Sequence, residues 1–102
     1  MILSNNMSDP IIPSTKSLIQ CAQMAVKLEK PICLDYYTAS CKKECRIGRD
    51  GPNGAKFLHK NEEEYTSPLE SMFKVENDNN VDDFLLETQN SIYIVSGLMF
   101  SW

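Results

Sequence analysis

Residues 15–37 read TKSLIQCAQMAVKLEKPICLDYY, and the spacing of their hydrophobic side chains changes at Pro31. Before this proline, apolar residues recur at the intervals of a helix face, at Leu18, Cys21, Ala22, Ala25 and Leu28, with Ile19 and Val26 widening that face. After it, apolar residues occupy alternate positions from Ile32 to Tyr36, as in a strand with one face buried. Because proline cannot continue a helix, the stretch predicts an amphipathic helix followed by a strand over 32–37.

The sequence after this stretch predicts more strands joined by turns. Residues 49–54 read RDGPNG, and their Asp-Gly and Asn-Gly pairs tolerate positive φ, which is typical of a hairpin tip. A short strand at 45–48 is predicted to lead into this tip, and further strands are predicted at 55–60, 69–76, 84–88 and 92–95, with Phe73 and Val75 facing the core. We therefore expect an α+β fold, with one N-terminal amphipathic helix and a five-stranded, mostly antiparallel curled sheet. An SH3-like small barrel is the expected architecture, because closure hides strand edges.

The length of 102 residues is that of one small domain. Hydrophobic residues make up 42% and charged residues 24%, which argues against a disordered chain. We expect a flexible leader at 1–13 and a single α+β domain at 14–102, with Ser14 or Thr15 capping the helix. No apolar run approaches the ~18 residues of a membrane span, and the first residues lack the regions of a secretion signal. These features predict a cytoplasmic protein without a membrane span.

Charge is unevenly distributed along the chain, whose net charge is −4. Residues 31–60 hold six cations against three acids, whereas residues 61–102 hold nine acids and the single base Lys74. The six cations are Lys42, Lys43, Arg46, Arg49, Lys56 and Lys60. Either the two regions attract one another within the domain, or the basic segment binds an acidic partner. In a nucleic-acid complex these cations would contact phosphates while Tyr36 or Tyr37 stacks on bases, although the net negative charge argues against this.

The cysteines and the single histidine form no recognisable metal motif. Nominal zinc ligands are Cys33, Cys41, Cys45 and His59, but no CxxC pair is present. We therefore expect reduced thiols, no metal and no cofactor. Cys21 lies on the apolar helix face and is expected in the core, whereas Cys41 and Cys45 are expected on a basic loop whose cations lower the thiol pKa.

Nothing in the sequence indicates an enzyme. It contains no phosphate-binding loop, zinc-protease motif or nucleophile elbow. The adjacent acids Asp82 and Asp83 are expected to be solvated in a turn. A thiol or metal enzyme that uses Cys41, Cys45 and His59 is the least favoured interpretation, because catalysis would need a geometry that the sequence does not supply.

Four large apolar side chains lie in the last five residues, at Leu98, Met99, Phe100 and Trp102. Chain ends fray unless contacts hold them, and aromatic residues and methionine are enriched at interface centres. We expect this segment to mediate self-association or binding to another protein. The alternative is that it folds back over the open end of the sheet.

Three stretches carry a resemblance to a known group of proteins: 29–37 (EKPICLDYY), 63–68 (EEYTSP) and 87–96 (ETQNSIYIVS). Together they resemble short uncharacterised proteins of the nucleocytoplasmic large DNA viruses, the giant viruses. The resemblance implies a product of the host cytoplasm or of the virion. It brings no catalytic residue, cofactor or substrate.

The sequence thus favours a non-enzymatic protein-interaction or structural protein, which the resemblance would make a minor virion component or a viral accessory protein. Its expected partner is another protein or a second copy of itself. The predicted contact residues are the six cations of the basic segment and the four apolar residues of the C-terminal segment. The alternative is a nucleic-acid-binding small β-barrel that uses the basic segment 42–60.

Overall fold

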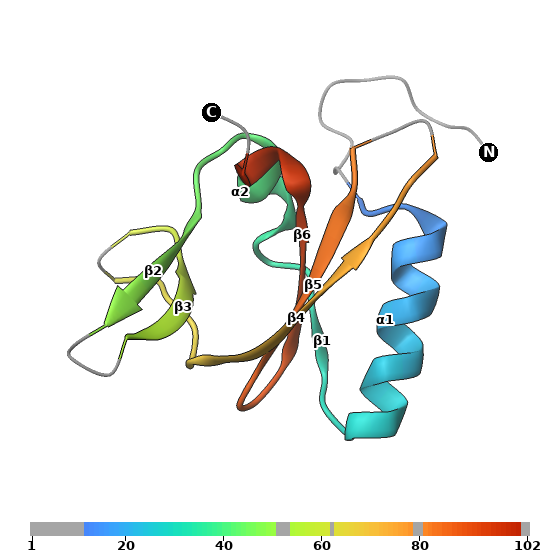
Figure 1. Cartoon of the computed structure of the whole chain (residues 1–102), viewed down its shortest axis with the longest axis horizontal. Coiled ribbons are helices and arrows are strands. Elements are labelled where there is room, and N and C mark those ends of the chain that lie inside the picture. The colour runs from blue at the N-terminus through green and yellow to red at the C-terminus, as the bar shows by residue number, and fades with distance from the viewer. Residues whose placement is uncertain (1–11, 51–53, 62, 79–80, 101–102) are drawn as a thin grey trace.

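The computed structural model describes residues 12–50, 54–61, 63–78 and 81–100, so most of the predicted leader lies outside the described residues. In chain order the elements are α1 (Thr15–Leu28), β1 (Ile32–Cys33), α2 (Tyr37–Cys41), β2 (Arg46–Asp50), β3 (Ala55–His59), β4 (Leu69–Val75), β5 (Asp83–Thr88), β6 (Ile92–Ser96) and the 3-10 helix η1 (Gly97–Phe100). Four strands form a mixed sheet in the order β1-β6-β5-β4, and β2 and β3 form a separate hairpin (Figure 1). No helix in the described part of the chain is long and apolar enough to cross a membrane.

Helix α1 forms where the hydrophobic spacing predicted it. Its N-cap is Ser14, whose Oγ accepts a hydrogen bond of 3.1 Å from the backbone N–H of Ser17. At the other end, Glu29 adopts the left-handed conformation with φ 56°, and its N–H bonds back to the carbonyl of Ala25. The helix therefore ends at Leu28, three residues before Pro31, as expected from the restriction that proline imposes.

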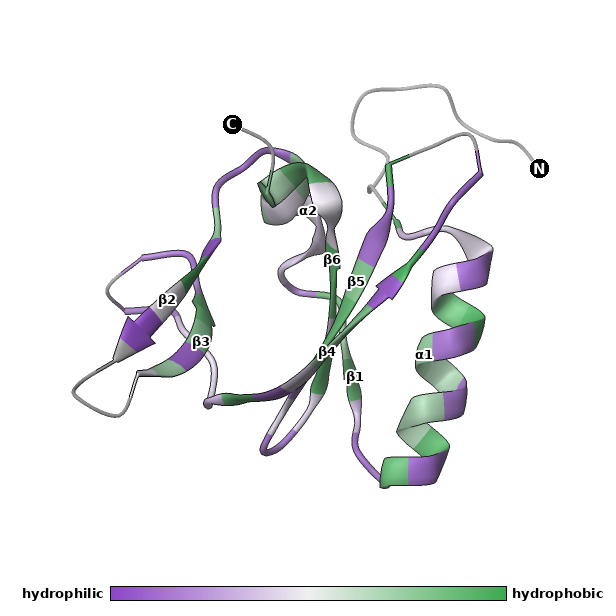
Figure 2. Ribbon diagram, in the orientation of Figure 1, coloured by the Kyte–Doolittle hydropathy of each residue, from purple (hydrophilic) through white to green (hydrophobic). Residues whose placement is uncertain are grey.

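The buried face of α1 is narrower than the sequence predicted. Cys21 is fully buried, and the partly buried residues beside it are Leu18, Met24, Ala25 and Leu28. Ile19 and Val26 are instead 53% and 79% exposed, and Ala22 is also exposed. Figure 2 shows hydrophilic and hydrophobic residues alternating around the helix. A helix packed on one sheet buries a single stripe, which explains the difference.

The strand predicted over 32–37 is present only at Ile32–Cys33, where it pairs in parallel with the start of β6. The chain then turns, because the N–H of Tyr37 donates to the carbonyl of Leu34 at 3.1 Å and α2 begins. This turn buries both Tyr36 and Tyr37, although strict alternation would have placed only one of them inside. Each ring enters a different core.

Strands β5 and β6 are covered on both faces. In Figure 1, α1 lies on one side of the sheet, and α2, η1 and the hairpin lie on the other. Leu85, Ile92 and Ile94 belong to the core beneath α1, whereas Leu86 and Val95 belong to the core on the opposite face. Burial on both faces accounts for the nearly continuous hydrophobic runs in these two strands.

The hairpin predicted about residues 49–54 is present. Strands β2 and β3 pair in antiparallel register from Arg46↔His59 to Asp50↔Ala55, and Gly54 has a positive φ of 68°. The pairing therefore extends into the predicted tip, of which 51–53 lie outside the described residues.

The α+β class is confirmed, but a five-stranded SH3-like barrel is not. The described residues form six strands in two sheets, and β2 and β4 each lie at an edge. The hairpin joins the rest through the segment before β4, where Thr66 donates its N–H to the carbonyl of Leu58 at 2.8 Å. In β4, Val75 is buried as predicted, whereas Phe73 is 47% exposed and its predicted core position is wrong. An edge strand has one side without a neighbouring strand to cover its side chains.

Candidate functional site

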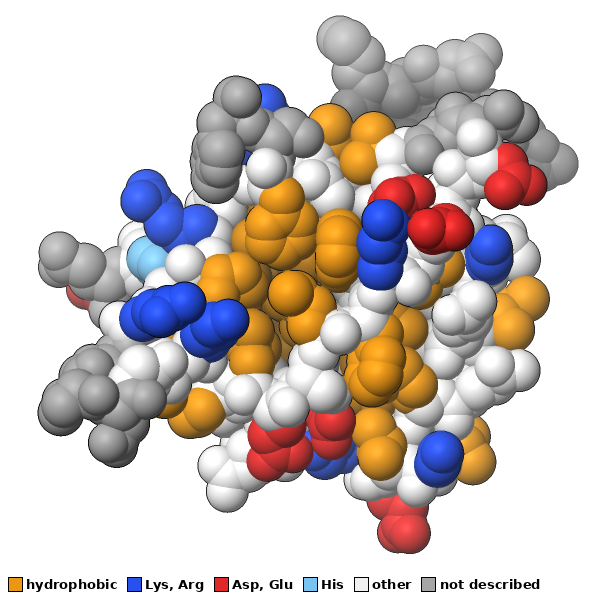
Figure 3. Space-filling view, viewed as in Figure 1, with side chains coloured by type: hydrophobic (Ala, Val, Ile, Leu, Met, Phe, Trp, Pro, Cys, Tyr) orange, Lys and Arg blue, Asp and Glu red, His pale blue; other side chains and the backbone are white. Residues whose placement is uncertain are grey.

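A groove of about 650 Å³ separates the edge strand β4 from the hairpin. Its large apolar lining residues are Ile47, Leu69, Met72 and Phe100. Figure 3 shows hydrophobic side chains gathered over the region between the hairpin and β4, with Lys and Arg side chains on the hairpin side. Met72 is 50% exposed and Phe100 is 37% exposed, so the groove presents apolar surface to water.

The groove follows from the way the strands alternate. Met72 lies on the hairpin side of β4, while its neighbour Phe73 lines a second hollow of about 510 Å³ against α1, together with Met24 and Leu28. Phe100 is held in place by Phe84, because their rings make an edge-to-face contact with 4.9 Å between centroids. An edge strand with apolar side chains on both faces is a template for pairing with another strand.

The six predicted cations do not form a single patch. Arg49 and Lys56 are cross-strand partners in the hairpin, and both line the groove. Arg46 and Lys60 line a separate hollow on the other face of the hairpin. Lys42 and Lys43 are exposed in the turn after α2 and line neither. Alternation along β2 sends Arg46 and Arg49 to opposite faces, and Lys60 lies just beyond the end of β3, which no count of charge along the sequence detects.

The C-terminal segment packs partly into its own domain. Met99 is 1% exposed and lies in the core formed by residues of α2, the hairpin and the sheet. Leu98 is half-buried, Phe100 borders the groove, and Trp102 lies outside the described residues. Met99 therefore follows the alternative prediction that the tail folds back. Phe100 stays partly exposed, and it lines the same groove as Arg49 and Lys56.

A buried polar cluster anchors the start of α1. Asp83 is 1% exposed, and its carboxylate accepts hydrogen bonds from Ser17 Oγ at 2.6 Å and from Tyr37 Oη at 2.7 Å. Burial and the neighbouring carboxylate both raise the pKa of Tyr37, so its hydroxyl stays protonated and donates. The prediction that Asp83 is solvated in a turn is therefore wrong. The hydrogen bonds of this carboxylate hold α1 to β5, so Asp83 has a structural role.

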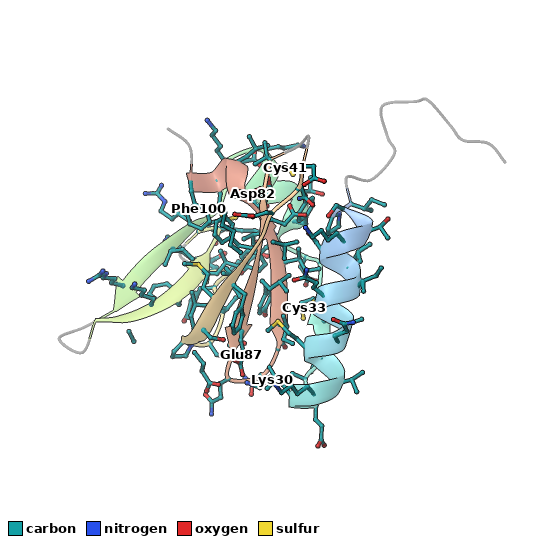
Figure 4. The ribbon with its side chains drawn as sticks, turned by 45° about the vertical axis from the view of Figure 1, so that its right-hand side comes forward. Lys30, Cys33, Cys41, Asp82, Glu87 and Phe100 are labelled. Atoms are coloured by element: carbon teal, nitrogen blue, oxygen red, sulfur yellow. The ribbon has the colours of Figure 1, made fainter. Side chains whose placement is uncertain are left out.

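A second anchor lies at the opposite end of α1, where Figure 4 shows Lys30 beside Glu87. Lys30 Nζ lies 2.6 Å from a carboxylate oxygen of Glu87, 2.8 Å from the carbonyl of Thr88 and 3.1 Å from Glu70. The hydrogen bond from Lys30, and then that from Ser71, lowers the pKa of Glu87. The ammonium has three acceptors, so this cluster connects α1 to β4 and β5.

The cysteines are more protected than the sequence predicted. Cys45 is 3% exposed, and burial raises the pKa of its thiol to about 11. Burial also raises the pKa of Cys21 to about 11 and that of Cys41 above its ordinary value. The prediction that nearby cations lower the pKa of Cys41 and Cys45 is therefore wrong. Figure 4 shows Cys33 and Cys41 well apart, and the described residues contain no group of three potential ligands that could hold a metal.

This arrangement predicts a distinct order of thiol reactivity. We expect iodoacetamide at about pH 8 to modify Cys33 first and Cys21 and Cys45 last, because burial limits access and a raised pKa leaves little thiolate. Mass spectrometry of peptides over time measures the order, with the urea-unfolded protein as the control in which the rates converge. Modification of Cys45 as fast as Cys33 in the native protein would contradict the burial of Cys45.

No family model, curated protein or solved structure matches this chain. The assignment of a function therefore depends on the groove, the edge strand and the hairpin themselves.

Proposed function

We propose that this protein is a non-enzymatic interaction protein that binds an extended segment of a partner protein along the edge of β4. The observation that carries the proposal is the edge strand bordered by an apolar groove with Arg49 and Lys56 at its rim. Backbone N–H and C=O groups on the outer side of an edge strand supply hydrogen bonds to an added strand, and the adjoining groove selects its side chains. The resemblance to giant-virus proteins extends this proposal to a role in the host cytoplasm or the virion.

The groove also indicates the chemistry of the partner segment. Alternate side chains of an added strand would enter the groove, where Met72 and Phe100 offer apolar contacts. Arg49 and Lys56 carry two positive charges into the same groove, whose described lining residues include one acid, Glu70. The favoured segment is therefore extended, with apolar residues and acidic residues in alternation.

Binding of a labelled peptide tests this proposal. The probe is a fluorescein-labelled peptide of about eight residues that alternates valine with aspartate, and its valine–lysine counterpart serves as the control peptide. We expect the double variant Arg49→Ser/Lys56→Ser to weaken binding of the acidic peptide by about 5- to 30-fold, because two rim charges are lost. Fluorescence anisotropy measures the affinity, and amide chemical shifts in the nuclear magnetic resonance spectrum locate the peptide.

A matched variant distinguishes binding in the groove from general electrostatic attraction between the peptide and the protein. Lys42→Ser/Lys43→Ser removes the same charge at exposed positions outside the groove and is expected to change the affinity by less than about twofold. Met72→Glu is expected to weaken binding as well, since it places a negative charge in the groove. Equal losses in the two double variants, or shifts that avoid β4, would refute the proposed site.

A further inference from the structure

The outer face of the hairpin carries a cluster of aromatic rings that neither core uses. Arg46 pairs with His59 and Gly48 pairs with Phe57, so these four residues share the face of the hairpin that points away from Ile47 and the core. Tyr65 joins them through an isolated bridge to His59. The three rings line a hollow of about 590 Å³.

The rings lie close together and stay accessible. The centroid of the Phe57 ring lies 5.3 Å from that of His59 and 5.9 Å from that of Tyr65. Tyr65 is 62% exposed, although it is a large aromatic residue. A Cβ atom at Gly48 would lie 3.0 Å from two atoms of the His59 ring and 3.1 Å from Phe57, so the rings extend across the glycine backbone.

The charges around the rings restrict the ligand. Arg46 is exposed, and it lines the hollow together with Lys60, whose ammonium is 3.8 Å from Glu64 and 4.8 Å from the centre of the Tyr36 ring. Two cations beside the rings disfavour the quaternary ammonium ligands that aromatic cages bind. They favour a ligand that combines a flat π-face with negative charge. A nucleotide unit has both features.

We propose that the outer face of the hairpin binds single-stranded nucleic acid, with a base stacked on Tyr65 and Phe57 and a phosphate held by Arg46. The lining of the hollow follows β3 from Ala55 to His59, which suits a continuous strand. The sequence suggested Tyr36 and Tyr37 for stacking, but both rings are buried. Tyr65 and Phe57 take this role instead. The site lies on the opposite hairpin face from the groove beside β4, so each proposal can fail without the other.

Anisotropy of a fluorescein-labelled oligothymidylate of about ten nucleotides tests the proposal. Tyr65→Ala is expected to weaken binding by about 5- to 100-fold, the range for one lost base stack, while Tyr65→Phe keeps affinity within about twofold. Phe73→Ala is the matched control, since it removes another exposed ring from a distant face, and it should leave affinity unchanged. Gly48→Ala moves the rings without removing one, and we expect it to weaken binding also.

The salt dependence gives a second measurement. One phosphate contact by Arg46 predicts a slope of log affinity against log salt of about −0.7, and Arg46→Ser should reduce it to near zero. Thermal melting of each variant confirms that it is folded. The proposal is overturned if Tyr65→Ala binds as tightly as the unchanged protein, if inorganic tripolyphosphate displaces the oligonucleotide as well as unlabelled oligothymidylate does, or if a tryptophan-containing peptide binds the rings more tightly.

Discussion

Replacing Asp83 with alanine is expected to lower the free energy of unfolding by about 3 to 5 kcal/mol. The carboxylate is 1% exposed and accepts hydrogen bonds from the hydroxyls of Ser17 and Tyr37. Its removal leaves both hydroxyls without that acceptor in a buried site, and each unpaired buried group costs about 1 to 3 kcal/mol. Urea unfolding followed by circular dichroism measures the change.

Two control variants distinguish this cluster from a general effect of charge. Asp82→Ala removes the neighbouring acid, whose side chain is 33% exposed, and should cost about 1 kcal/mol or less. Tyr37→Phe removes one hydroxyl of the cluster. Because that hydroxyl is then absent, adding Asp83→Ala should cost less than it does alone. If Asp83→Ala were no more damaging than Asp82→Ala, the buried cluster would not anchor α1.

Truncating Met99 to alanine is expected to destabilise the protein by about 2 to 5 kcal/mol, even though this residue lies near the C-terminus. Met99 is 1% exposed and packs in the same core as Leu58, Leu86 and Val95. The smaller side chain loses its transfer free energy and leaves a cavity that the neighbouring strands fill only in part. The midpoint of urea unfolding measures the loss.

Phe100→Ala is the matched control for Met99, because it changes the next residue, which is 37% exposed. We expect it to have the smaller effect on stability and, under the proposed function, to weaken peptide binding in the groove. An unchanged unfolding midpoint in Met99→Ala, accompanied by loss of self-association on size-exclusion chromatography, would instead assign Met99 to an interface between molecules.

The two proposed surfaces use opposite faces of one hairpin. Arg49 and Lys56 point to the groove beside β4, and Arg46 points to the aromatic hollow. Successive residues of a strand point to opposite faces. A substitution in the hairpin can therefore alter one surface and leave the other intact. Binding of the two proposed partners, a protein segment and a nucleic-acid strand, can thus be tested separately on the same folded chain.

Local patterns in the sequence were sufficient to predict the fold class. The helical spacing from Leu18 to Leu28 predicted α1, and the Asp-Gly and Asn-Gly pairs predicted the hairpin. These features depend on neighbouring residues within a few positions, where intrinsic conformational preference and side-chain period act directly. The α+β class, the hairpin and the last three strands follow from them.

Contacts between distant segments decided the rest. Tyr36 and Tyr37 are adjacent, yet α2 turns the chain so that one ring enters each core. In the sequence, Asp83 looks like any other acid in a turn. Its hydrogen bonds come from Ser17 and Tyr37, which are 66 and 46 residues away in sequence. The division of the cations between two surfaces likewise depends on how the hairpin is placed against β4. Sequence alone determined which segments become helix or strand, whereas only the tertiary structure decided which polar and aromatic side chains meet, because those contacts join residues whose separation leaves no local pattern.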